Sequence, residues 1–218
     1  MESDFFFISL AKLQIYDIVN IVLSFSNYKM KYFPKVSRGN VYLSPLNPED
    51  YEVFTKWMND KRITDGITTW PKIISLWSEK EWLETLQKTG EYNLAIVKKD
   101  GDKLLWTVGL FHIDHINQSA ELGISIWDFD EHSKWYWADA INAMLLFAYD
   151  TLNLYNVYLQ VKSFNKKAIA CYKKVWFQEI WTRHHCQYCN GERHDLIIME
   201  MLKPNWREKN NEKLLHDK

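Results

Sequence analysis

Short apolar runs separated by polar turns predict several strands along the chain. One run lies at 41–46, and three more follow one another at 92–97, 104–113 and 119–127. The turn at 99–102 contains Asp-Gly, a dipeptide typical of a tight hairpin. The three successive runs therefore predict an antiparallel meander.

Helix-start signals predict two helices between the first strand and the meander. Asn-Pro-Glu-Asp at 47–50 predicts a helix that runs to about Met58, because Asn is a favoured cap and Pro fits the first helical position. Ser78 is followed three residues later by Glu81, and this capping box predicts a helix at 78–88.

The second half of the chain predicts a long helix, a buried strand, a shorter helix and a hairpin. Asn190-Gly191 is the strongest short hairpin signal available. The chain after Pro204 is polar and predicts a frayed tail. In chain order, the predicted elements are a helix at 136–152, a strand at 155–161, a helix capped by Asn165 that ends near 175, and strands at 177–188 and 192–202.

The order of these elements predicts an α+β fold. It favours one mixed, mostly antiparallel sheet of about seven strands with helices on both faces. Length and composition favour a single domain at 36–206, preceded by an extension at 1–35 and followed by a polar tail at 207–218.

Residues 5–25 are rich in Phe, Ile, Leu and Val but do not predict a membrane span. Polar residues interrupt the run, which leaves no stretch of about 18 clean apolar residues. A basic region and a small-residue cleavage site, both typical of a secretory signal, are missing from it. Three interpretations stay open: a leader outside the fold, including a start mis-assigned upstream of Met30; a packed amphipathic helix; and a peripheral membrane anchor.

Charge and cysteine content exclude several classes of protein. The 27 basic and 28 acidic residues give a net charge of -1, so no overall field attracts nucleic acid or anionic lipid. Cys171, Cys186 and Cys189 are an odd set that does not make a disulfide framework. Cys186 and Cys189 also face opposite sides of a predicted strand, which argues against a metal site. We expect a cytoplasmic protein that binds no metal and no nucleic acid, and a homodimer is compatible with the sequence.

The stretch His132-Ser133-Lys134-Trp135-Tyr136-Trp137-Ala138 is the strongest candidate for a binding loop. It lies between a predicted strand and the start of the long predicted helix. Unpaired N–H groups and the positive end of the helix dipole converge at such a helix start, and both attract anions. This context therefore predicts a phosphate-binding loop.

Four further motifs carry a family resemblance. They are Val41-Tyr42-Leu43-Ser44-Pro45-Leu46, Trp57-Met58-Asn59-Asp60, Ser119-Ala120-Glu121-Leu122-Gly123-Ile124 and Asn165-Lys166-Lys167-Ala168-Ile169-Ala170-Cys171-Tyr172-Lys173-Lys174-Val175. Together they resemble the GNAT superfamily of acetyl-CoA-dependent N-acetyltransferases, in particular the branch with ribosomal-protein and polyamine acetyltransferases. The resemblance implies acetyl-CoA as co-substrate, direct transfer of its acetyl group to a primary amine, and a loop at 132–138 that wraps the coenzyme pyrophosphate.

The resemblance also implies roles for single residues. Tyr172 matches the usual general acid, which protonates the leaving thiolate, and its alternative role is that of a core aromatic residue. Glu121 is the candidate base for the amine proton, and its alternative role is that of an ion-paired or sheet-edge carboxylate. Asn165 is expected both to cap its helix and to contact the coenzyme. The pantetheine arm is expected to pair with the backbone of Ile124, Ser125 and Ile126.

The candidate binding loop departs from the family pattern at two positions. The family has Gln/Arg-x-x-Gly-x-Gly/Ala, and this chain has Trp135 and Trp137 in place of the glycines. Glycine serves there because it allows φ > 0 and lets the backbone approach phosphate without a Cβ. Tryptophan also stands where related sequences often carry glycine at Trp77, Trp106, Trp127, Trp176 and Trp181.

The composition points to a common origin for these tryptophans. The chain has 7 glycines and 11 tryptophans in 218 residues, whereas about 7% glycine is usual. We interpret the seven tryptophans as UGA codons, which some bacterial lineages translate as glycine, and we expect glycine at 135 and 137 in the working protein. Two alternatives stay open: a degenerate protein that has lost coenzyme binding, and a non-catalytic acyl-CoA sensor with a blocked loop.

The sequence leaves the acceptor open among a small amine, a polyamine and a protein N-terminal amine. Asp60, Asp65, Glu79 and Glu81 would suit a cationic acceptor, but acidic residues at helix starts also serve as caps. A metal-binding interaction module, suggested by the histidines and cysteines at 184–189, is the third class of function considered.

Overall fold

The structure is a computed structural model that describes residues 30–67, 73–86, 91–126 and 136–216. The described residues from Tyr32 onward belong to one compact unit. The apolar run at 5–25 lies outside the described residues, so its three interpretations stay open. None of the helices in the described ranges is both long enough and apolar enough to cross a membrane.

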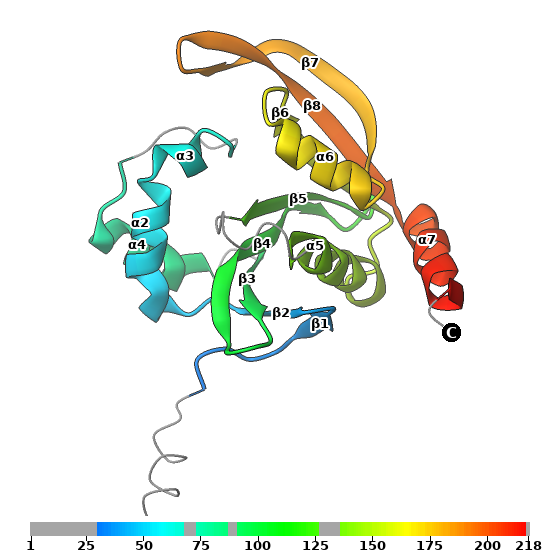
Figure 1. Cartoon of the computed structure of the whole chain (residues 1–218), viewed down its shortest axis with the longest axis horizontal. Helices are drawn as coiled ribbons and strands as arrows, with labels where there is room; N and C mark the ends of the chain where they lie inside the picture. Colours follow the sequence, from blue (N-terminus) through cyan, green and yellow to red (C-terminus); the bar gives the residue numbers. More distant parts are fainter. Residues whose placement is uncertain (1–29, 68–72, 87–90, 127–135, 217–218) are drawn as a thin grey trace, which may run out of the picture. The chain divides into compact units, whose positions relative to one another are not determined.

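One eight-stranded sheet forms the frame of the compact unit (Figure 1). Its strand order is β1-β2-β3-β4-β5-β6-β8-β7, and every neighbouring pair is antiparallel except β5 and β6, which are parallel. This confirms the predicted α+β fold, with β1 as a strand that the apolar pattern did not predict. The strands are β1 (Val36–Arg38), β2 (Val41–Pro45), β3 (Tyr92–Lys98), β4 (Lys103–Asp114), β5 (Ser119–Ile126), β6 (Asn156–Lys162), β7 (Gln178–Cys189) and β8 (Glu192–Leu202).

The helices follow the predicted order with two additions, α3 and α7. They are η1 (Pro48–Asp50), α2 (Tyr51–Met58), α3 (Lys61–Thr64), α4 (Leu76–Thr85), α5 (Tyr136–Leu146), α6 (Lys166–Lys174) and α7 (Lys203–His216). A π-helical turn, Phe147–Thr151, continues α5. It closes with a hydrogen bond from the Leu152 N–H to the Phe147 carbonyl at 3.1 Å.

Alternating side chains of the sheet enter two hydrophobic clusters on its opposite faces. Leu43 and Ile96 join the larger cluster, to which α5 and α6 contribute. Tyr42 and Val97, their neighbours in sequence, join the smaller cluster with Phe54 of α2 and residues of α4. The sheet is therefore covered by helices on both faces, as the sequence predicts.

The hairpin predicted at Asn190-Gly191 was confirmed. Asn190 and Gly191 both have positive φ, 53° and 87°, as a two-residue type I′ hairpin requires. The start of α4, however, differs from the prediction. Ser75 is its N-cap, and the capping box joins Ser75 to Ser78 rather than Ser78 to Glu81. The helix therefore begins one turn earlier than predicted.

The frayed tail predicted after Pro204 was wrong as far as His216, because these residues form α7. Trp206 is only 4% exposed, and its indole N–H donates to the Asn142 side chain of α5 at 3.2 Å. Asn210 is also buried and accepts a hydrogen bond from Arg38 of β1 at 2.6 Å. One aromatic anchor and one buried amide thus fix a helix whose composition is otherwise polar.

Trp176 occupies a position at the end of α6 that favours glycine. The Trp176 N–H donates to the Lys173 carbonyl at 3.0 Å, and the Phe177 N–H donates to the Tyr172 carbonyl at 3.1 Å. These two bonds define a Schellman motif, whose C′ residue adopts the left-handed conformation. Trp176 accordingly has φ +67°, which is strained for a bulky aromatic residue.

Trp176→Gly is expected to be more stable than Trp176→Ala by about 1 kcal/mol in the free energy of unfolding, because only glycine adopts this φ without strain. Both variants lose the same indole packing, so their comparison isolates the backbone. Urea unfolding of the two proteins measures the difference. Equal stability of the two variants would show that the position does not require glycine.

The other tryptophans interpreted as glycines give a mixed picture. Trp176 is the only one of them with positive φ among the described positions. Trp106 is 3% exposed and packs its ring 4.2 Å from that of Trp57, so its side chain fills space in the core. Trp77 and Trp181 are exposed, and Trp181 lies at a bulge of β7. Trp127 and Trp135 lie outside the described residues.

Candidate functional site

The two parallel strands at the centre of the sheet diverge after a short paired stretch. Residues 119–121 of β5 pair with residues 156–158 of β6, and the pairing ends at Glu121 and Tyr158. Beyond this point β5 continues along β4, while β6 continues along β8. One backbone edge of residues 122–126 is therefore free of β6 and is available to a ligand that lies along it.

The first described residues of α5 are the last three residues of the predicted binding loop. Tyr136, Trp137 and Ala138 form its first turn, where N–H groups have no partner within the helix. Asp139 also lies in this turn, but its carboxylate accepts a hydrogen bond from the Asn40 N–H of the β1–β2 turn at 2.9 Å. His132, Ser133, Lys134 and Trp135 lie outside the described residues, so the predicted loop is only represented by its last three residues.

Glu121, the predicted base, ends the paired stretch of β5. Ala120 and Leu122 on either side of it belong to the larger cluster, so the Glu121 side chain points to the opposite face of the sheet. Its carboxylate lies 3.1 Å from Nδ1 of His112, which is exposed. Both roles considered for Glu121, that of a base and that of an ion-paired or sheet-edge carboxylate, are compatible with this contact.

Tyr158 lies beside Glu121 across the two strands. Burial raises the pKa of its phenol, and the nearby Glu121 carboxylate raises the pKa further. The Tyr158 phenol therefore stays protonated at neutral pH. The sequence did not single out Tyr158, although its place opposite a candidate base in a parallel pair is a signal that could have found it.

Tyr172, the predicted acid, lies on α6 and is 8% exposed. It belongs to the larger cluster together with Ala120 and Leu122. Burial raises the pKa of its phenol, and the neighbouring Cys171 raises it further, so the phenol keeps its proton at neutral pH. The Glu121 side chain therefore points away from the face of the sheet that carries the cluster with Tyr172.

Asn165 is confirmed as the N-cap of α6, because its side chain accepts a hydrogen bond from the Ala168 N–H at 3.1 Å. Its expected contact with the coenzyme stays a prediction. The backbone of Ile124, Ser125 and Ile126 lies in β5 and pairs with β4 on one side, which leaves the other side for the predicted pantetheine contact.

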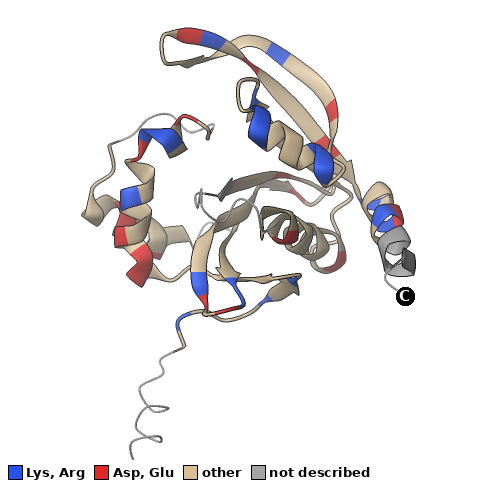
Figure 2. Ribbon diagram, viewed as in Figure 1, with Lys and Arg blue, Asp and Glu red and all other residues tan. Residues whose placement is uncertain are grey.

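The acidic residues considered for a cationic acceptor are largely occupied by cations of their own helix. Asp60 lies 2.6 Å from the Arg62 guanidinium, and Asp65 lies 2.6 Å from the Lys61 ammonium. Figure 2 shows basic residues on α3 and acidic residues beside its ends. Glu79, by contrast, is 4% exposed on the face of α4 that carries Leu83.

Glu79 has no hydrogen-bond partner for its Oε1 atom among the described residues. Burial raises the pKa of its carboxyl to about 6, from an ordinary value of 4.5. The folded protein therefore holds this proton more tightly than the unfolded chain does. The free energy of unfolding is therefore highest at low pH, where Glu79 is neutral, and it falls as the pH rises from 4.5 to about 6.

Glu79→Gln is expected to stabilise the fold above pH 6 by about 2 kcal/mol relative to its effect at pH 4.5, because an amide cannot become charged in this site. Urea unfolding of both proteins across this pH range measures the gain. Glu81→Gln, which changes an exposed carboxylate on the same helix, serves as the control and should show no such gain. A pH-independent difference between Glu79→Gln and the parent protein would contradict the prediction.

Lys162, Asp65 and Asn190 form a contact network that sequence patterns did not predict. The Lys162 ammonium donates to the Asp65 carbonyl at 3.0 Å, and the Asn190 amide donates to the Asp65 carboxylate at 2.9 Å. Lys162 ends β6, beyond the point where β5 diverges. A lysine at the end of a buried strand was the one signal that could have marked it.

Comparison with known proteins decides the family. Residues 40–178 match the acetyltransferase (GNAT) domain family. The chain is a GNAT acetyltransferase.

Curated relatives of this acetyltransferase include two enzymes with stated acceptors. It is 32% identical over 172 residues to spermidine N(1)-acetyltransferase of Escherichia coli (strain K12), which covers 75% of this chain and 86% of that protein. It is 28% identical over 100 residues to the putative ribosomal N-acetyltransferase YdaF of Bacillus subtilis (strain 168), which covers 45% of this chain and 54% of that protein.

The fold of the acetyltransferase also matches solved structures. Spermidine N-acetyltransferase from Vibrio cholerae, solved in complex with CoA and spermine, superposes with a TM-score of 0.70 at 23% identity. The match covers 77% of this chain and 98% of that one. The family and its relatives establish that the acetyltransferase uses acetyl-CoA and transfers the acetyl group to an amine.

Proposed function

We propose that acetyl transfer takes place where β5 and β6 diverge, with Glu121 as base and Tyr172 as acid. The observation that carries this proposal is the end of the parallel pairing at Glu121 and Tyr158. It frees a strand edge for the pantetheine amides and places a carboxylate at the start of the gap. The neighbouring start of α5 suits the pyrophosphate, because unpaired N–H groups of its first turn attract anions.

The proposed reaction proceeds by direct attack with both substrates bound. Glu121, or water held by it, takes a proton from the acceptor ammonium, and the neutral amine attacks the thioester carbon. The new C–N bond gives a tetrahedral oxyanion, which N–H groups of β5 can stabilise. The C–S bond then breaks, the carbonyl re-forms, and the Tyr172 hydroxyl donates its proton to the departing sulfur. The nitrogen of the new amide loses its second proton to solvent, and the Tyr172 oxygen takes up a proton from solvent.

The opposite placement of Glu121 and Tyr172 supports these two roles. An amine that loses its proton to Glu121 approaches from one face of the sheet, while the thiolate leaves toward α6 on the other face. A single residue on one face could not easily serve both ends of the reaction, because the nucleophile and the leaving group lie on different sides of the reacting carbon.

The acceptor belongs to one of three classes: a small amine, a polyamine or a protein N-terminal amine. The spermidine N(1)-acetyltransferases among the relatives support a polyamine. The pairing of Asp60 with Arg62 and of Asp65 with Lys61 supports an acceptor with a single ammonium group, because a polyamine would have to compete with these cations for the carboxylates. A homodimer remains an expectation from the sequence.

The proposal is tested by amine-dependent release of coenzyme A thiol from acetyl-CoA. Spermidine, a peptide with a free N-terminal amine and a simple monoamine represent the three acceptor classes. The assay uses the chain as printed and a version with glycine at the seven tryptophan positions. Thiol release that depends on one of these amines supports the proposal. Absence of thiol release from both versions would contradict the proposal, and tight binding of coenzyme A by both would then indicate a non-catalytic protein whose loop the tryptophans do not block.

A further inference from the structure

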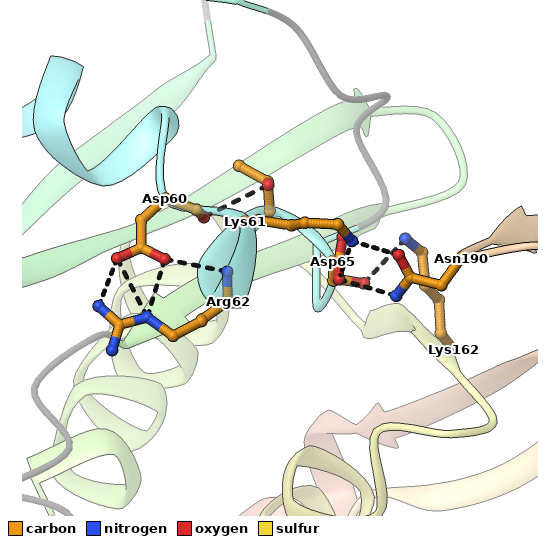
Figure 3. A network of polar contacts seen from close by, with 7 residues as sticks. Asp60, Lys61, Arg62, Asp65, Lys162 and Asn190 are labelled. Carbon is orange, nitrogen blue, oxygen red and sulfur yellow. Dashed lines mark hydrogen bonds and ion pairs between the residues drawn. The ribbon is translucent and has the colours of Figure 1, made fainter.

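Three segments that lie far apart in the sequence meet at the end of β6 (Figure 3). Asp65, in the turn after α3, lies at their centre. Its carboxylate accepts hydrogen bonds from Lys61 at 2.6 Å and from the Asn190 amide of the β7–β8 turn at 2.9 Å. Lys61 also donates to the Asn190 side-chain oxygen, which closes a ring of three residues. The backbone carbonyl of Asp65 accepts from Lys162 at 3.0 Å.

Lys162 is the one buried lysine among the residues that the structure describes, with 6% of its surface exposed. Burying an ammonium group costs free energy unless partners compensate for the lost water. Its partners here are the Asp65 carbonyl, the nearby Asp65 carboxylate and the Phe164 ring, whose centre lies 5.8 Å away. The contact of this costly ammonium with the Asp65 carbonyl ties the end of β6 to the turn after α3.

Asp65 is ionised in this network. Partial burial acts to raise the pKa of its carboxyl, but the hydrogen bonds from Lys61 and Asn190 and the charges of Lys61 and Lys162 outweigh it, so the pKa lies below its ordinary value. The Asp65 carboxylate therefore keeps its charge throughout the neutral range. Protonation of Asp65 does not loosen the network under ordinary conditions.

The turn that Lys162 holds lies directly against the coenzyme side of the site. A Cβ on Gly66 would lie 3.3 Å from the Asn165 amide nitrogen, so the backbone at Gly66 approaches the cap of α6 closely. Lys162 itself points to the same face of the sheet as Glu121, because Val157, Leu159 and Val161 alternate with it into the larger cluster. The network thus joins the acceptor face of the sheet to the start of α6.

We infer that Lys162 is a positioning residue for the acceptor: its ammonium group fixes the α3 turn at Asp65 and Gly66 against Asn165 and thereby builds one wall of the acceptor site. This inference rests on the proposed location of acetyl transfer at the divergence of β5 and β6. It assigns no contact between Lys162 and the reacting atoms. Two residues from elsewhere in the chain hold this turn at Asp65. Lys162 binds the Asp65 carbonyl, and Asn190 of the β7–β8 hairpin binds the Asp65 carboxylate.

Hydrogen exchange tests the structural half of the inference without any substrate. Lys162→Met keeps the length of the side chain but cannot donate a hydrogen bond, whereas Lys162→Arg keeps the charge and the donor. The Asp65 and Gly66 amides, bonded to the Lys61 and Ile63 carbonyls, are expected to exchange about tenfold faster in Lys162→Met and nearly as in the parent protein in Lys162→Arg. Lys173→Met, on the outer part of α6, is the control for the loss of one lysine.

Steady-state kinetics test the functional half with whichever amine supports thiol release. Lys162→Met is expected to raise the KM for that amine about tenfold, while its kcat and the Kd for coenzyme A stay within about twofold. Lys162→Arg should recover most of the loss, and Lys173→Met should show none. If neither the printed chain nor the version with seven glycines releases thiol with any amine, the proposed function is overturned. The hydrogen-exchange result does not depend on activity and would still stand.

Two results would overturn the inference while the proposed function stands. The first is unchanged exchange at Asp65 and Gly66 together with an unchanged KM in Lys162→Met. The second is a Lys162→Met variant with a lower melting temperature, a lower kcat and weaker binding of both coenzyme A and amine. This combination would show a general structural role for Lys162.

Discussion

Tyr172→Phe is expected to lower kcat about a hundredfold while it leaves the KM for acetyl-CoA within about threefold. The phenylalanine ring fills the same volume in the core beside Phe177, so the fold should not change. What the variant removes is the hydroxyl proton that stabilises the departing thiolate. Burial raises the pKa of this phenol, so the proton is present at neutral pH.

Tyr155→Phe is the matched control for Tyr172→Phe, because Tyr155 is exposed and lies outside the proposed machinery. It should keep the parent kcat. Pre-steady-state measurement adds a second check, since loss of the acid slows the chemical step rather than product release. An unchanged kcat in Tyr172→Phe would assign Tyr172 to core packing, the alternative that its sequence position leaves open.

Replacement of Trp135 and Trp137 by glycine is expected to tighten binding of coenzyme A by a factor on the order of a hundred. Phosphate oxygens that reach backbone N–H groups gain charge-assisted hydrogen bonds, and two of these account for such a factor. Glycine permits both the close approach and the positive φ that such loops use. Isothermal titration of the double variant and of the chain as printed measures the difference.

Trp77→Gly is the control for this comparison, because Trp77 is exposed on α4 and its loss should leave coenzyme binding unchanged. The gene offers an independent check, since UGG at the seven codons excludes translation of UGA as glycine. Tight binding of coenzyme A by the chain as printed would remove the steric argument. The φ of Trp176 supports the interpretation at one position, whereas the buried Trp106 gives it no structural support.

Features decided by neighbouring residues were predictable from the sequence. Asn190 and Gly191 adopt the hairpin conformation because their backbone preferences alone select it. Asn165 caps α6 because its side chain reaches an N–H three residues ahead. The start of α4 was harder, since Ser75 and Ser78 are both suitable caps and the helix is capped by Ser75.

Features decided by distant partners were not predictable. The chain after Pro204 has little apolar character, and only the space beside Tyr149 makes Trp206 an anchor for α7. The contact of Lys162 with Asp65 joins residues 97 positions apart, which no local pattern encodes. The sequence therefore offers candidates that lie on single elements, such as Glu121 on β5 and Tyr172 on α6, but not contacts in which three segments meet.

The bond between Arg38 and Asn210 has a consequence for synthesis of the protein. It joins residues 172 positions apart, so β1 cannot form this bond until almost the whole chain has been synthesised. Contacts of such long sequence separation slow folding, because the entropy of closing a large loop is lost before they form. Because Asn210 lies in the last helix of the chain, this bond cannot form until α7 has left the ribosome.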